Sequence, residues 1–139
     1  MGNAQSIPKI NFEDVQVACK NPEIYLLINT LPVYEQSCLI CNSVSALQEE
    51  AIINKHLKIN KNVAILVYGK NSSDETAYKK YQQLVQLGFS NVYLYLGGLF
   101  EWLLLQDVYG SCDFPTTSSQ LDILKYRPNS RLNVGLISY

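Results

Sequence analysis

Short apolar runs alternate with segments of helical spacing along most of this chain. Three runs are typical of buried strands, at 24–28, 63–68 and 91–96. Segments with the spacing of amphipathic or short apolar helices lie around them, at 10–19, 45–57, 76–87 and 100–106. Strands that alternate with helices in this way predict an α/β domain with a mainly parallel sheet.

The ends of the expected helices carry capping signals. Asn11 is placed to cap the first helix, and Ser45 with Gln48 has the pattern of a capping box at the start of the second. The second helix is expected to turn these side chains inward: Leu47, Ile52 and Ile53. Gly88 closes the third helix.

The length of 139 residues predicts one domain with a core of its own. We expect residues 1–8 to form a flexible N-terminal arm and residues 9–139 to form the domain. From about residue 107 the helical and strand patterns give way to a C-terminal extension. This part contains a loop from residue 109 and then a less regular tail.

Composition excludes several classes of function. The net charge is −1 and no run of Lys and Arg is present, so nucleic acid is not an expected partner. No apolar run approaches the roughly 20 residues that a membrane span needs. The four cysteines follow a start without a secretory signal, which favours free thiols in the cytoplasm. The chain has one histidine, His56, so only this imidazole is available as a general base. We expect His56 on the solvent face of its helix.

The stretch from residue 63 to residue 102 resembles the second half of a rhodanese-like (sulfurtransferase) domain. It has an apolar strand, a polar turn and a helix, followed by the string GFSNVYLYLGGLFEW at 88–102. The resemblance extends over roughly residues 9–106. It implies a three-layer α/β/α fold with a mainly parallel central sheet.

The same resemblance argues against the family's chemistry. Its strand typically ends in a nucleophilic cysteine, and here Gly69 stands in that place. A thiolate or an equivalent group is needed for attack, and glycine supplies none. The Asp-x-Arg pattern expected after the early strand is also missing at 28–31. The resemblance therefore implies a degenerate active-site loop with no catalytic residue and no cofactor, made of Gly69, Lys70, Asn71, Ser72 and Ser73.

Two interpretations of residues 69–75 stay open. The loop is a turn whose Ser, Asn and Asp side chains cap the next helix, or its N–H groups and Lys70 hold an anion. Asp74 and Glu75 would repel a phosphate, which favours the first interpretation.

The cysteines give the alternative functions. A sulfurtransferase with a relocated nucleophile would use Cys112, in a loop, or Cys38. Cys38 and Cys41 form a C-x-x-C, for which we favour structural packing over redox sensing. A zinc site would need His56 with Cys112 or Cys19, which lack a metal-binding spacing, so no metal is expected.

The N-terminal sequence MGNAQS fits the pattern for N-myristoylation at Gly2; the alternative is an unmodified arm. One acyl chain gives only weak, reversible membrane association. Residues 100–110 and 114–117 are similar to a degenerate rhodanese-like group encoded by large DNA viruses. Together these observations predict a non-catalytic binding or structural module with an unknown protein partner, located in the cytoplasm or, for a viral protein, in the host cytoplasm or virion.

Overall fold

The computed structural model describes residues 7–132, so the predicted lipidation site at Gly2 and most of the predicted arm lie outside it. The strands are β1 (Lys9–Ile10), β2 (Tyr25–Asn29), β3 (Ala64–Tyr68) and β4 (Val92–Tyr95). The α-helices are α1 (Phe12–Lys20), α2 (Glu49–Ile59), α3 (Glu75–Gln86) and α4 (Gly98–Tyr109). Two short 3₁₀ helices complete the described part, η1 (Val33–Glu35) and η2 (Ile123–Tyr126).

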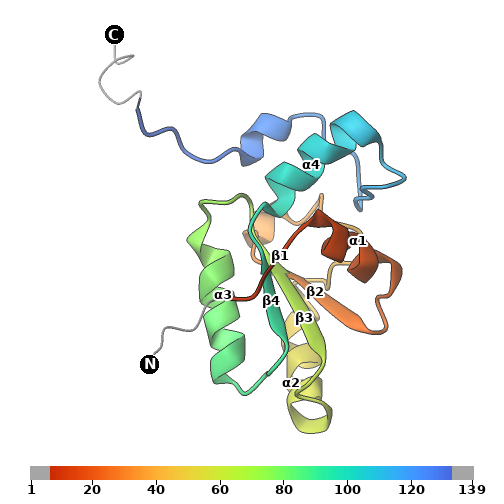
Figure 1. Cartoon of the computed structure of the whole chain (residues 1–139), viewed down its shortest axis with the longest axis vertical. Coiled ribbons are helices and arrows are strands. Elements are labelled where there is room, and N and C mark those ends of the chain that lie inside the picture. The colour runs from red at the N-terminus through yellow and green to blue at the C-terminus, as the bar shows by residue number, and fades with distance from the viewer. Residues whose placement is uncertain (1–6, 133–139) are drawn as a thin grey trace.

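The four strands form one parallel sheet in the order β1-β4-β3-β2 (Figure 1). Residue Asn29 pairs with Tyr68, and Tyr68 pairs with Tyr95, so three strands end in register. The chain segments that follow these strands therefore meet at one edge of the sheet. In parallel α/β sheets this is the edge at which ligands bind.

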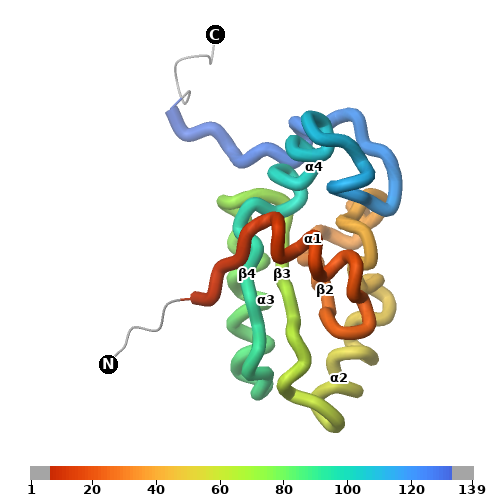
Figure 2. The backbone as a smooth tube through the Cα atoms, turned by 45° about the vertical axis from the view of Figure 1, so that its right-hand side comes forward, coloured from red at the N-terminus to blue at the C-terminus, as the bar shows by residue number. Residues whose placement is uncertain are grey.

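Helices cover both faces of the sheet, as the sequence predicts. Leu66 and Tyr68 belong to the core cluster that also contains side chains of α1 and α4. Ile65 and Val67, which alternate with them, pack in the second cluster with side chains of α2 and α3. In Figure 2, α1 lies in front of the sheet and α3 behind it. This is the three-layer α/β/α fold.

Local signals account for the helix ends that the sequence placed correctly. The Asn11 side chain accepts hydrogen bonds from the backbone of Glu13 and Asp14, and the Asp14 carboxylate accepts one from the Asn11 backbone N–H. Gly88 follows α3 with a φ of 111°, a conformation that glycine adopts without strain. The structure therefore confirms the predicted cap at Asn11 and the predicted helix end at Gly88.

The predicted start of the second helix is wrong. The Val44 N–H donates to the Leu27 carbonyl at 2.8 Å, which holds the chain beside the sheet at that point. A turn follows, in which Ser45 accepts the Leu47 N–H rather than capping a helix, and α2 begins only at Glu49. Leu47 is consequently 94% exposed instead of facing the core.

Three further elements differ from the sequence prediction. A two-residue strand, β1, precedes α1, where the sequence indicated the first turn of a helix. Helix α4 is longer than predicted at both ends. The irregular tail contains η2, whose Tyr126 is 1% exposed and packs in the same core cluster as Trp102. Ile123 of the same short helix packs against this cluster as well, and a pattern of two residues is too short to mark an element in the sequence.

Candidate functional site: a closed loop beside a basic groove

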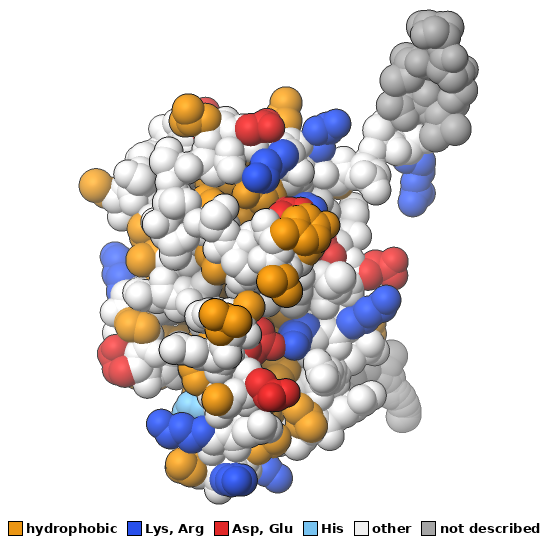
Figure 3. Space-filling model, turned by 180° about the vertical axis from the view of Figure 1, so that it is seen from behind, with side chains coloured by type: hydrophobic (Ala, Val, Ile, Leu, Met, Phe, Trp, Pro, Cys, Tyr) orange, Lys and Arg blue, Asp and Glu red, His pale blue; other side chains and the backbone are white. Residues whose placement is uncertain are grey.

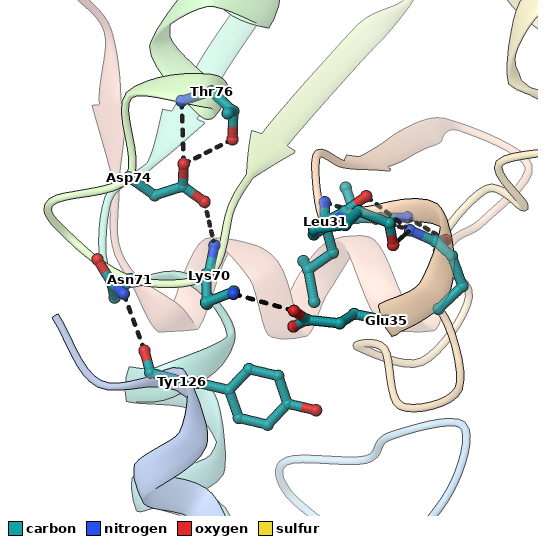
Figure 4. A network of polar contacts seen from close by, with 10 residues as sticks. Leu31, Glu35, Lys70, Asn71, Asp74, Thr76 and Tyr126 are labelled. Carbon is teal, nitrogen blue, oxygen red and sulfur yellow. Dashed lines mark hydrogen bonds and ion pairs between the residues drawn. The ribbon is translucent and has the colours of Figure 1, made fainter. Parts of the chain in front are cut away.

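The predicted degenerate loop lies where the sheet register places it, directly after β3. We call residues 69–74 the site loop. Thr30 follows β2 and Leu96 follows β4, so both lie beside Gly69 at the carboxyl edge of the sheet. The loop leads into the N-terminus of α3 (Figure 4). The five residues predicted for the site are therefore together in space.

The carboxylate of Asp74 fills the inside of the site loop. One oxygen, Oδ2, accepts the backbone N–H of Lys70 at 2.8 Å. The other accepts the backbone N–H of Thr76 at 3.0 Å and its hydroxyl at 2.6 Å. Partial burial opposes ionisation of Asp74, but these hydrogen bonds outweigh it and lower the pKa of the carboxyl below its usual value. The loop thus carries its own anion.

The start of α4 closes the loop from another side. The N–H groups of Leu99 and Phe100 donate to the carbonyls of Gly69 and Lys70, at 3.0 and 2.9 Å. Gly98 has a φ of 65°, and a Cβ on it would lie 2.7 Å from the Gly69 carbonyl oxygen. Only glycine fits at this contact, which explains the second residue of the Gly-Gly pair.

The C-terminal extension contacts the loop at Asn71. The side-chain nitrogen of Asn71 donates to the Tyr126 carbonyl at 2.9 Å, and its oxygen accepts the Ser73 N–H at 2.9 Å. The Asp74 N–H donates to the Asn71 carbonyl at 3.1 Å. Three loop N–H groups, those of Lys70, Ser73 and Asp74, are therefore satisfied within the loop itself.

Polar side chains after β2 brace the loop from the opposite side. The Lys70 ammonium lies 3.1 Å from the Glu35 carboxylate (Figure 4). The Thr30 and Thr76 hydroxyls are 2.8 Å apart. The buried Asn29 amide exchanges hydrogen bonds with Gln36, at 3.2 and 2.8 Å. Asn29, one member of this neutral amide pair, lies in the segment 28–31, where the resemblance implies an Asp-x-Arg pattern.

A groove of about 930 Å³ lies beside the closed loop. Its walls are residues 70, 71 and 73–76, two residues that follow β2, and residues 125, 127 and 129–131 of the extension. We call this cavity the basic groove, because Lys125, Arg127 and Arg131 line it together with Lys70. The sequence does not reveal this groove, because three of its four cations are scattered along a tail without a regular pattern.

The structure separates Cys112 from the site loop and buries Cys19. Cys112 is exposed and follows the C-terminal end of α4, whereas the loop contacts the first turn. A helix of this length spans roughly 18 Å, so Cys112 is remote from the loop N–H groups. Cys19 is buried, and burial, with a smaller contribution from Cys41, raises the pKa of its thiol to about 12.

The C-x-x-C lies in a segment that packs against the extension. Leu39 and Thr117 exchange backbone and side-chain hydrogen bonds, and the Cys41 N–H donates to the Pro115 carbonyl at 3.0 Å. Cys38 is 1% exposed, and its thiol donates to the Ser118 carbonyl at 3.4 Å. These contacts fit the packing interpretation, and redox sensing through Cys38 and Cys41 stays the untested alternative.

Other expectations meet mixed outcomes. His56 is half-buried rather than solvent-facing, and its Nδ1 has no hydrogen-bond partner within residues 7–132. Trp102 is fully buried, as predicted for a core residue. Within the described residues there is no group of three or more potential metal ligands, and no helix is long and apolar enough to cross a membrane.

Comparison with known proteins identifies the family. The family model for the rhodanese-like domain matches residues 19–105. No curated protein matches the chain significantly. The rhodanese-like domain of the Anabaena Alr3790 protein has a TM-score of 0.58 at 18% identity, covering 91% of this chain and 88% of its own. The BH2092 protein of Bacillus halodurans has a TM-score of 0.56 at 20% identity, covering 70% of this chain and 72% of its own. At these identities the solved structures show the shared fold alone, and it is the family match, over more than half of the chain, that establishes that the chain belongs to the rhodanese-like domain family.

Proposed function

We propose that this chain is a non-catalytic rhodanese-like module that binds a protein partner. The observation that carries the proposal is the relation between Gly69 and Asp74. A Cβ at position 69 would lie 2.6 Å from Asp74 Oδ2, so the space that a nucleophilic side chain would need already holds a carboxylate. Asp74 also takes the Lys70 N–H, a group of the kind that stabilises a transferred anion.

The cysteines support the same conclusion. A sulfur carrier must present a thiolate beside groups that stabilise it. Cys19 and Cys38 are buried, and the exposed Cys112 lies beyond the far end of α4 from the site loop. A relocated nucleophilic cysteine at position 112 would therefore act without stabilisation by the N–H groups of the site loop.

Turnover of thiosulfate with cyanide tests this proposal. We expect the full-length chain to produce no more thiocyanate than a buffer blank. The Cys112→Ser variant is the matched control, because it removes the exposed thiol outside the site loop. Thiocyanate production that the wild type shows and Cys112→Ser lacks would support the relocated-cysteine sulfurtransferase instead. Production by both proteins would also contradict the proposal and would point to Cys38 or Cys41.

We further propose that the protein is virus-encoded and N-myristoylated at Gly2. The sequence pattern MGNAQS supports the modification, and the similarity of residues 100–110 and 114–117 to a viral rhodanese-like group supports the origin. Intact mass after expression in eukaryotic cells tests the acylation, with Gly2→Ala as the control. An acyl mass on the wild type alone is the expected result, and an unmodified wild type would contradict it.

A further inference from the structure

The basic groove concentrates positive charge on a chain whose net charge is −1. Four of the 11 Lys and Arg residues line it, against two carboxylates, Asp74 and Glu75. Figure 3 shows Lys and Arg side chains next to hydrophobic ones at the upper end of the molecule, the end that bears α4 and the extension in Figure 1.

Internal pairing leaves most of this positive charge uncompensated. Lys70 is paired with Glu35, and the Asp74 carboxylate is occupied by hydrogen bonds from its own loop. Within residues 7–132, the side chains of Lys125, Arg127 and Arg131 form no ion pair. The groove therefore presents three cations without an ion-pair partner among residues 7–132, beside the carboxylates of Asp74 and Glu75.

The cations are held on an ordered support. Tyr126, between two of them, is 1% exposed and its carbonyl accepts the Asn71 side chain. The Arg127 guanidinium donates to the Leu124 carbonyl at 2.8 Å. The Arg127 guanidinium is thus held against the anchored η2 before a ligand binds, which lowers the entropy cost of association at this position.

Exposed apolar residues adjoin the groove-lining residues along the chain, and we call Val33, Tyr34 and Leu124 the rim of the groove. Pro32 lines the groove, and the next two residues, Val33 and Tyr34, are 83% and 84% exposed. Leu124, beside Lys125, is 60% exposed. A single inorganic anion would leave this rim and most of the 930 Å³ unused. An extended segment with both carboxylates and apolar side chains would use both features.

We propose that the basic groove binds an acidic peptide segment of a partner protein. Carboxylates of that segment pair with Lys125, Arg127 and Arg131, and an apolar or aromatic side chain packs on Val33 and Tyr34. This inference rests on the proposed function, because it names the chemistry of the partner that the non-catalytic module binds.

Fluorescence anisotropy of the full-length chain with a labelled peptide tests the proposal. The probe is a peptide of about ten residues in which Asp and Glu alternate with Phe and Leu, long enough to run through the groove. We expect binding that weakens from about 50 to about 500 mM NaCl, since exposed ion pairs are screened by salt. A peptide with Lys in place of Asp and Glu should not bind.

Matched variants locate the site. Lys125→Gln, Arg127→Gln and Arg131→Gln together should weaken binding about tenfold or more. The control combines Lys20→Gln, Lys55→Gln and Lys58→Gln, which removes the same charge from exposed positions on α1 and α2 and should leave affinity within about twofold. Lys125→Gln with Arg131→Gln keeps the Arg127–Leu124 hydrogen bond and should still lose several-fold.

Each other outcome overturns the inference. Equal loss in the control would show a general charge effect, and tight binding of a single-stranded oligonucleotide would show a polyanion site without peptide preference. Failure of the peptide to bind would remove the acidic-partner assignment and leave the non-catalytic module standing. Sulfur transfer by the wild type would instead remove the proposed function, whatever the peptide result.

Discussion

The Asp74 carboxylate occupies the position that a side chain on residue 69 would need. A Cβ built on Gly69 lies 2.6 Å from Asp74 Oδ2 and 3.0 Å from the Thr30 hydroxyl. The absence of a nucleophilic side chain at residue 69 and the Asp74 carboxylate inside the site loop are therefore linked, because the two groups would need the same space. Restoring a cysteine at this position would not by itself restore the geometry of a working loop.

Adding a side chain at position 69 should destabilise the protein through Asp74. We expect Gly69→Ala to lower the free energy of unfolding by about 1–3 kcal/mol, because it overpacks a closed site. Asp74→Ser shortens the side chain and keeps a helix-capping oxygen. In the double variant, the Gly69→Ala penalty should shrink by at least about 0.5 kcal/mol.

Urea unfolding of the two single variants and the double variant measures this coupling. Because each variant serves as the reference for another, the cycle contains its own control. If the two changes in unfolding free energy were additive, the contact with Asp74 would not be the reason why Gly69→Ala destabilises the protein.

Stability should depend on the ionisation of Asp74 in acid. The pKa of this carboxyl is lower in the folded chain than its ordinary value, so as the pH falls the unfolded chain binds the proton first. The contribution of Asp74 is then complete above about pH 4–5 and is lost as the pH falls through the folded pKa. We expect Asp74→Asn to flatten the decline in unfolding free energy over this acid range. The comparison is made by urea titration at several pH values, and identical pH profiles would contradict the prediction.

The C-terminal extension should be part of the cooperative fold through Tyr126. Tyr126→Ala removes an aromatic side chain that is 1% exposed, and we expect a loss of about 3–5 kcal/mol. Leu121→Ala is the matched control: Leu121 is 93% exposed on the same extension, and its loss should stay within about 0.5 kcal/mol. Thermal or urea unfolding measures both variants. Equal stabilities would mean that the extension is not anchored at Tyr126.

The thiols should react in the order of their burial. Cys112 is exposed and should be alkylated first by iodoacetamide at neutral pH. Cys19 and Cys38 should react last, because both thiols are buried and the pKa of Cys19 is raised to about 12. Peptide mapping after timed labelling gives the order, and Cys112→Ser identifies the fast phase. Early labelling of Cys19 in the folded chain would contradict the burial that we describe.

The sequence predicts the sheet and much of the site because local signals agree there. Ile65 and Val67 alternate with Leu66 within a run that reads as a strand, and Asp74 has the type of residue that caps a helix. The sequence does not reveal that the Asp74 carboxylate turns back to the Lys70 N–H, because this depends on a loop conformation fixed by contacts with α4.

The errors arise where contacts distant in sequence decide the structure. Ser45 has a good capping pattern, yet the bond from Val44 to Leu27 keeps the chain beside the sheet and delays α2. Tyr126 has one apolar neighbour at helical spacing, Ile123, and a pair this short does not by itself indicate that Tyr126 anchors the extension over the site loop. The basic groove follows from that anchor, which is why composition alone did not predict it.

The most direct test of the central claim is the intact mass of the full-length protein before and after incubation with thiosulfate. A rhodanese that works through a cysteine gains one sulfur atom as a persulfide. We predict no gain in mass, in parallel with a mock-treated sample. A gain of one sulfur atom, reversed by cyanide, would contradict a non-catalytic module, and peptide mapping would then identify the carrier among Cys38, Cys41 and Cys112.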